Sequence, residues 1–272
     1  MSGAASPSGS DLRVRVIAGI VLGVGALAIL WAGGPLFALL MGLGGCAIVW
    51  EWTGITGAAS RPWVRPAGLL VMVAAVVAGW FHLWGWAALA TLLLATALAL
   101  TGWDRERRHT MWLGLGLAYA VPPVLALLWL RDQADGLIIV LWLMLSVWAT
   151  DSFAYFAGRA IGGPKLAPTI SPKKTWAGLA GGMAGAALTG ALVAAAFGLQ
   201  PLALAPLSAA IAVVSQGGDL LESALKRAFD VKDSGHLIPG HGGIMDRVDG
   251  LVAVAPLVAL GLVLGDVWQV LA

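Results

Sequence analysis

The sequence predicts an all-α integral membrane protein with about nine transmembrane helices and a polar active-site cavity at the cytoplasmic face. Three observations indicate this fold class: 60% of the 272 residues are hydrophobic, only 11% are charged, and the apolar residues form long runs. A soluble domain usually carries about 25% charged residues. The 37 glycines suit helices that pack closely in a bilayer.

Nine apolar runs are long enough, or nearly so, to cross a bilayer, which takes roughly 17–25 residues as a helix. Helices are expected because lipid offers no partner to unpaired backbone groups, and no segment alternates as barrel strands do. The predicted spans cover approximately residues 14–32, 35–50, 66–82, 85–102, 112–130, 136–157, 178–197, 202–217 and 250–271. The preceding residues 1–12 are predicted to form a disordered tail, and the first span is too long for a cleaved signal peptide.

The basic residues indicate the orientation of the spans. With the N-terminus inside, fifteen of the sixteen Lys and Arg residues fall in cytoplasmic segments, and only Arg131 falls outside. Cytoplasmic loops carry such an excess, so we expect this orientation, with the C-terminus outside. Residues 13–135 are interpreted as N-terminal transmembrane helices. Residues 136–272 are interpreted as a catalytic region with cytoplasmic loops at 158–177 and 218–249.

The loop at 218–249 gathers many of the charges of the chain. Its six acids, of fourteen in all, are Asp219, Glu222, Asp230, Asp233, Asp246 and Asp249. Its four basic residues are Lys226, Arg227, Lys232 and Arg247. A lipid-headgroup patch should be net basic. An acidic excess suits a divalent cation between carboxylates, with the basic groups left for phosphates. The charge count fits equally well a solvated loop whose charges pair with each other.

Spacing within this loop favours a binding site. The segment 219–230 reads as a helix with one polar face, formed by Asp219, Ser223, Lys226 and Asp230. Asp246 and Asp249 share a face if the last helix begins early, although such a pair alone is a weak signal. His236 and His241 flank a Pro-Gly turn without a nearby cysteine, which disfavours zinc. His241 is interpreted as a phosphate or backbone donor, or as structural.

The other informative loop contains "GGPKLAPTISPKKTWAG". Its proline and glycine content predicts an irregular cytoplasmic loop. A single lysine there would be explained as a membrane anchor. Ser171, Pro172, Lys173, Lys174 and Thr175, however, form one compact donor-rich turn, which suits a polyphosphate.

Together, "SALKRAFDVKDSGHLIPGHGGIMDRVD" (223–249), "DSFAYFAGR" and "SPKKTWAG" resemble the phosphatidate cytidylyltransferase family, over most of the chain. One departure is Ala177, where the family commonly has Glu, which leaves open what performs the role of that acid. The resemblance implies Mg²⁺-dependent transfer of CMP from CTP to phosphatidic acid, giving CDP-diacylglycerol and pyrophosphate for phospholipid biosynthesis. A second, monovalent cation beside Mg²⁺ is a further expectation.

This reaction brings two polyanions together, so catalysis is mainly positioning and charge neutralisation. No strong general base is needed, because a phosphomonoester is largely ionised at neutral pH. The expected catalytic residues are Asp219, Lys226, Asp246, Arg247 and Asp249, with the three aspartates as metal ligands. The expected phosphate-binding residues are Ser171, Pro172, Lys173, Lys174, Ser223, Arg227, His241, Gly242 and Gly243.

The resemblance also implies a homodimer in a bacterial cytoplasmic membrane, with CTP and bilayer phosphatidic acid as partners and no nucleic acid. The closest rival is a CTP-dependent kinase of a polyprenol or other membrane alcohol. A CDP-alcohol phosphotransferase is disfavoured, since "DRVDG" matches only the opening of its motif. A transporter is disfavoured because the charges gather at one face and not at the midplane. A purely structural scaffold would leave the charged pattern unexplained.

Overall fold

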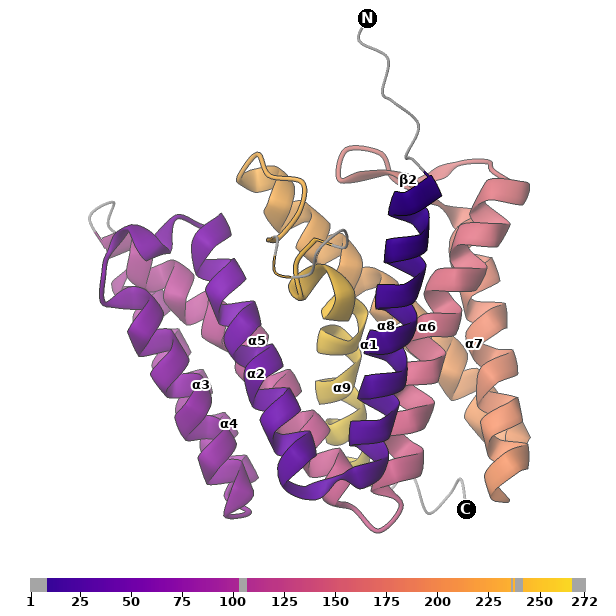
Figure 1. Cartoon of the computed structure of the whole chain (residues 1–272), viewed down its shortest axis with the longest axis horizontal. Helices are drawn as coiled ribbons and strands as arrows, with labels where there is room; N and C mark the ends of the chain where they lie inside the picture. Colours follow the sequence, from indigo (N-terminus) through magenta and orange to yellow (C-terminus); the bar gives the residue numbers. More distant parts are fainter. Residues whose placement is uncertain (1–8, 103–106, 236, 238–241, 266–272) are drawn as a thin grey trace, which may run out of the picture.

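The computed structural model describes residues 9–102, 107–235, 237 and 242–265, and the described chain is almost entirely helical (Figure 1). Its helices are α1 (Gly9–Ala32), α2 (Gly34–Ile55), α3 (Val64–Trp80), α4 (Trp84–Thr101), α5 (Arg108–Asp132), α6 (Gly136–Ala160), α7 (Trp176–Phe197), α8 (Pro201–Ala228) and α9 (Met245–Gly265). A short 3₁₀ turn, η1 (Ala58–Ser60), follows α2, and strands β1 (Lys165–Ala167) and β2 (Ser171–Thr175) precede α7. The predicted all-α class is confirmed, while most of the predicted tail lies outside the described residues.

Each predicted span corresponds to one helix. Within the described residues, seven helices are long and apolar enough to cross a membrane, and the two others are α1, with a shorter apolar stretch at Val21–Ala32, and α3. The chain is therefore an integral membrane protein by the length and composition of its helices. Two predicted spans ended too early, because α2 continues to Ile55 and α8 runs unbroken to Ala228. The predicted span at 202–217 and the predicted helix at 219–230 are thus one helix, which ends two residues early and leaves Asp230 outside it, at a φ of +54°.

The interior of the bundle is formed largely by α5, which packs against α2, α3, α4 and α9. Many large apolar side chains elsewhere remain exposed, as expected of helices that face lipid. Small residues let α6 and α7 approach closely, since a Cβ on Gly185 would lie 2.4 Å from the ring of Phe153. Deep in the bundle, the fully buried Trp142 of α6 donates a hydrogen bond of 2.8 Å from Nε1 to Ser208 Oγ of α8.

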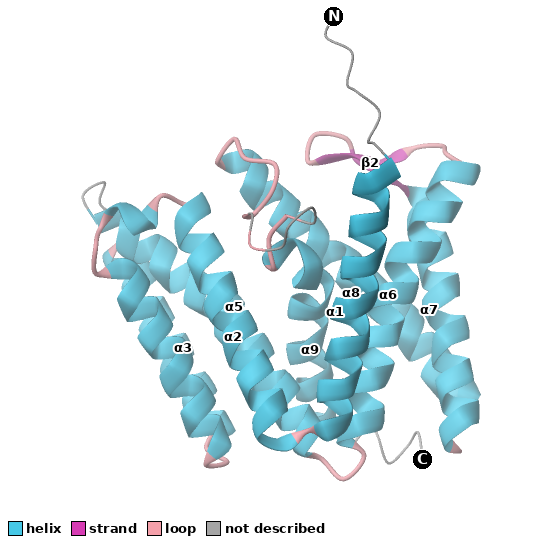
Figure 2. Ribbon diagram, in the orientation of Figure 1, coloured by secondary structure: helices cyan, strands magenta, loops and turns pink. Residues whose placement is uncertain are grey.

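The polar connections gather at one end of the bundle. The start of α1, the α2–α3 connection, the β1–β2 hairpin and the segment between α8 and α9 all lie at the same end (Figure 2). At the opposite end, Arg131 donates from Nε to Leu30 O over 2.9 Å, at the C-terminus of α1. This grouping agrees with the predicted segregation of Lys and Arg. That this end faces the cytoplasm, and that it forms a polar cavity, remain predictions.

The loop at 158–177 is more regular than predicted. Strands β1 and β2 pair antiparallel, with Lys165 opposite Thr175 and Ala167 opposite Ser171. The prediction of an irregular loop was wrong, because the proline and glycine content on which it rested does not exclude a short hairpin. In a two-stranded hairpin, an outward-facing N–H needs no partner, so Pro172 is tolerated. Thr175 ends the hairpin and caps α7, accepting a hydrogen bond from the Gly178 N–H at 3.0 Å.

The bond between Trp142 and Ser208 should contribute to stability. Ser208→Ala leaves the indole N–H buried without its partner, which should lower the free energy of unfolding by about 1–3 kcal/mol. Thermal unfolding in detergent measures the effect. Thr96→Ala on α4 is the control, because its hydroxyl is exposed and bonds only within its own helix. Equal unfolding midpoints for the two variants would contradict the prediction.

Candidate functional site

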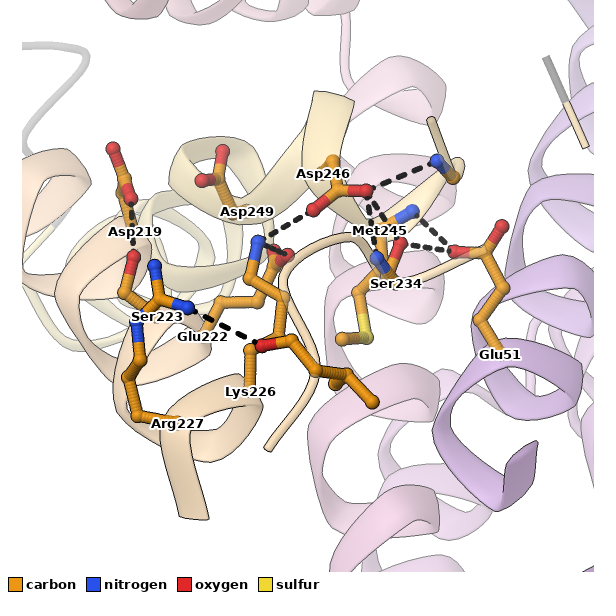
Figure 3. A network of polar contacts seen from close by, with 12 residues as sticks. Glu51, Asp219, Glu222, Ser223, Lys226, Arg227, Ser234, Met245, Asp246 and Asp249 are labelled. Atoms are coloured by element: carbon orange, nitrogen blue, oxygen red, sulfur yellow. Dashed lines mark hydrogen bonds and ion pairs between the residues drawn. The ribbon is translucent and has the colours of Figure 1, made fainter. Parts of the chain in front are cut away.

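The charges of α8 and α9 meet in one polar network at the charged end of the bundle (Figure 3). At its centre, Lys226 Nζ lies 2.5 Å from Asp246 Oδ1 and 2.9 Å from Glu222 Oε1. The side chains of Lys226, Asp246 and Glu222 are only 13%, 11% and 1% exposed. Because so little water reaches them, these groups depend on one another as partners, although Glu222 Oε2 is buried without a hydrogen-bond partner among the described residues. Glu222 was counted among the acids of the loop, but no role was predicted for it.

The early start of α9 brings Asp246 to Lys226 of α8. The helix begins at Met245, five residues before the predicted span, so Asp246 and Asp249 both lie in its first turns. The condition under which the two aspartates share a face is therefore met. Acidic side chains are also favourable there, because the N-terminus of a helix carries a partial positive charge.

The loop before α9 wraps around the second oxygen of Asp246. Oδ2 accepts hydrogen bonds from the Ser234 N–H (2.9 Å), the Ser234 hydroxyl (2.9 Å) and the Gly243 N–H (3.0 Å). Gly242 has a φ of +82°, and a Cβ on Gly243 would lie 1.9 Å from Ser234 Oγ. The glycines thus allow a close approach that other residues would block. The Gly243 N–H donates to Asp246 in this structure, and its role as a phosphate donor stays a prediction.

Glu51 of α2 completes the network, and the sequence reasoning missed it. Its side chain is 3% exposed and accepts hydrogen bonds of 2.8 Å each from the Ser234 hydroxyl, the Ile244 N–H and the Met245 N–H. The signal that could have found it is an acid in "VWEWTG", at the end of an apolar run. A carboxylate near the membrane interior requires a partner.

The two predicted loops meet through Lys174 and Asp219. Lys174 Nζ on β2 lies 2.6 Å from Asp219 Oδ2 on α8, and Ser223 donates to Asp219 Oδ1 over 3.2 Å. Side chains alternate along a strand, so Lys173 points away from Lys174, and it is exposed. The prediction that both loops belong to one site is thus supported by a direct ion pair.

Asp249 and Asp151 add negative charge beside Asp219. Helices α8 and α9 touch closely, since a Cβ on Gly218 would lie 2.7 Å from the carbonyl oxygen of Asp249. Asp249, Asp219 and Asp151 lie near enough to repel one another electrostatically. Lys174 and Arg247 partly offset this charge at Asp151. The result is a group of carboxylates bordered by cationic side chains, an arrangement able to accept a cation and phosphates together.

The remaining predicted residues are mostly exposed. Ser171 is half-buried and Pro172 exposed on β2, and Arg247 is exposed on α9. Arg227 is exposed as well, and its Nη1 donates to Val231 O over 3.4 Å. His236 and His241 lie outside the described residues. Within the part of the chain that is described, no three His, Cys, Asp or Glu side chains already converge as metal ligands.

The chain resembles known enzymes over nearly its whole length. The sequence profile of the cytidylyltransferase family matches residues 13–264. The phosphatidate cytidylyltransferase of Brucella melitensis biotype 1 is 42% identical over 258 residues, which cover 92% of this chain and 93% of the relative. The phosphatidate cytidylyltransferase of Pseudomonas aeruginosa is 38% identical over 268 residues, which cover 91% of this chain and 96% of that relative. The phosphatidate cytidylyltransferase of Haemophilus influenzae is 33% identical over 282 residues, which cover 90% of this chain and 96% of that relative. The predicted resemblance is confirmed.

The pair formed by Lys174 and Asp219 should hold the hairpin against α8. Lys174→Ala removes the pair, so the hairpin should open locally more often than in the wild type. Proteinase K should then cleave residues 161–175 faster, by a factor on the order of several-fold. Lys173→Ala is the matched control, because Lys173 is the exposed neighbour on the same strand. Similar cleavage rates in the two variants would show that the pair does not anchor the hairpin.

Proposed function

The chain belongs to the cytidylyltransferase family, and we propose that it transfers CMP from CTP to phosphatidic acid, forming CDP-diacylglycerol and releasing pyrophosphate. The observation that carries this proposal is the Lys226–Asp246 network together with the Lys174–Asp219 pair, both built on α8 at one end of an apolar bundle. Groups for phosphates and a cation lie where acyl chains can remain in the bilayer. Relatives named phosphatidate cytidylyltransferase, which match more than nine-tenths of this chain, support the same substrates.

The chemistry needs no residue to act as a strong base. A phosphate oxygen of phosphatidic acid attacks the α-phosphorus of CTP, and the bond from that phosphorus to the oxygen bridging to the β-phosphorus breaks. The electron pair leaves with pyrophosphate. Both reactants are polyanions, so the protein must reduce their repulsion and hold them in line. Lys226, Lys174 and Arg247 are the cationic groups proposed for this role.

Magnesium is part of the proposal, and the donors present suit it. Asp219, Asp246 and Asp249 offer the hard oxygen ligands that Mg²⁺ prefers. Asp219 and Asp249 repel each other, and a divalent cation between them would relieve that repulsion. Asp246 already accepts four polar contacts, so Asp219 and Asp249 are the more open of the three. When bound, Mg²⁺ would neutralise charge on the transferred phosphate.

We place the N-terminus and the site on the cytoplasmic side of a bacterial inner membrane, with the C-terminus outside. The support is the grouping of basic residues at the end of the bundle that carries the site, together with the positive-inside rule. CTP is made in the cytoplasm, so a site at that face can reach it. The homodimer expected from the resemblance stays a prediction.

Labelled CTP distinguishes this reaction from its closest rival. Membranes containing the protein, incubated with Mg²⁺, phosphatidic acid and CTP labelled in the base, should place label in the lipid extract. The label should require phosphatidic acid and disappear with EDTA. Label that reaches an alcohol acceptor only from γ-labelled CTP would instead establish a lipid kinase and contradict the proposal.

A further inference from the structure

We propose that Glu51 is a positioning residue, which sets the orientation of Asp246 by holding the two segments that bind and carry that aspartate. The catalytic consequence rests on the proposed function. Glu51 belongs to α2, in the N-terminal part of the chain, whereas every predicted site residue lies after residue 150. The N-terminal helices would thus take part in the chemistry through this carboxylate (Figure 3).

Both oxygens of Glu51 are engaged with the α8–α9 connection. Oε1 accepts from the Ile244 N–H, and Oε2 accepts from the Met245 N–H and from the Ser234 hydroxyl, each at 2.8 Å. The first N–H groups of a helix have no partner within the helix. At α9, a residue more than 190 positions away supplies that partner. The start of the helix is therefore fixed to α2.

Ser234 connects Glu51 directly to Asp246. Its Oγ lies 2.8 Å from Glu51 Oε2 and 2.9 Å from Asp246 Oδ2. A hydroxyl has a single hydrogen and donates to one carboxylate at a time, while the Ser234 N–H keeps a separate bond to Asp246. Glu51 thus holds Ser234, which binds Asp246, and Met245, which precedes it in the chain. Asp246 in turn faces Lys226.

The loop backbone packs directly on the Glu51 carboxylate. A Cβ on Gly235 would lie 2.9 Å from Oε1, and one on Gly243 would lie 2.5 Å from Oε2. Such distances leave no room for a side chain on either glycine, so the loop backbone lies close against the carboxylate. Displacing Glu51 would therefore change the path of the loop, and with it the donors that surround Asp246.

Glu51→Gln is the sharpest test, because it keeps the size of the side chain while removing its charge and one of its two acceptor oxygens. Glutamine has one acceptor oxygen, and its NH₂ group cannot accept from a backbone N–H. The variant should lose one of its bonds to Ile244 or Met245. Ser234→Ala is a second, milder variant, which removes the hydroxyl bridge and keeps the backbone bond to Asp246.

Two readouts separate positioning from general stability. Hydrogen exchange of peptides covering residues 229–245 should be at least about tenfold faster in Glu51→Gln, as for a loop released from local protection. The kcat for CMP transfer should fall at least about tenfold, while the KM for CTP changes less than about threefold, because the loss is mainly in the transition state. Ser208→Ala is the control, destabilising the bundle without altering either readout at temperatures below its unfolding.

The exchange rate and the kcat together decide whether Glu51 positions Asp246. Wild-type exchange at 229–245 in both Glu51→Gln and Ser234→Ala would overturn the proposal. Faster exchange with normal kcat would make Glu51 a structural cap and would also overturn it. Absence of CMP transfer in the wild type would refute the proposed function, and the exchange measurement would still decide whether Glu51 holds the loop.

Discussion

The ion pair between Lys226 and Asp246 is the interaction on which the candidate site depends. Two charges with so little exposure are stable only when each has its partner and further hydrogen bonds, since removing one leaves the other uncompensated. Glu222 supplies a second partner for Lys226, and the Ser234 and Gly243 backbone supplies donors for Asp246. The loop, the end of α8 and the start of α9 are each constrained by this one pair.

The fold meets that constraint by extending helices beyond the apolar core. Helix α8 carries Asp219, Glu222 and Lys226 out of the bundle on one rigid element, so their spacing is set by helical geometry. Gly218 lets α8 approach α9 closely at Asp249, next to Asp219 in the sequence. A site on helices is held more precisely than one on loops. Phosphoryl-type transfer depends on such precision, because it relies on positioning and charge.

The sequence predicts the helices well and their polar ends poorly. Apolar length located all nine described helices, seven of which are long and apolar enough to cross a membrane, because a span is set by the thickness of the bilayer and not by tertiary contacts. The ends of α2 and α8 were missed because polar residues continue both helices. Lys174 and Asp219 were each singled out, but their contact depends on the hairpin and could not follow from local spacing. Glu51 was missed for a related reason, since its partners lie more than 180 positions away. Asp246 was expected to be a metal ligand, and only the folded loop reveals how many hydrogen bonds it already accepts.

The most direct measurement is a double-mutant cycle on the central pair, with the rate of CMP transfer in a single turnover as the readout. It needs Lys226→Met, Asp246→Asn and the double variant, all confirmed as folded in the membrane. If the pair acts as one unit, the double variant should lose little more activity than the worse single variant, because the first substitution already disrupts the site. Losses that multiply would show that Lys226 and Asp246 act independently, and would contradict a site organised around their contact.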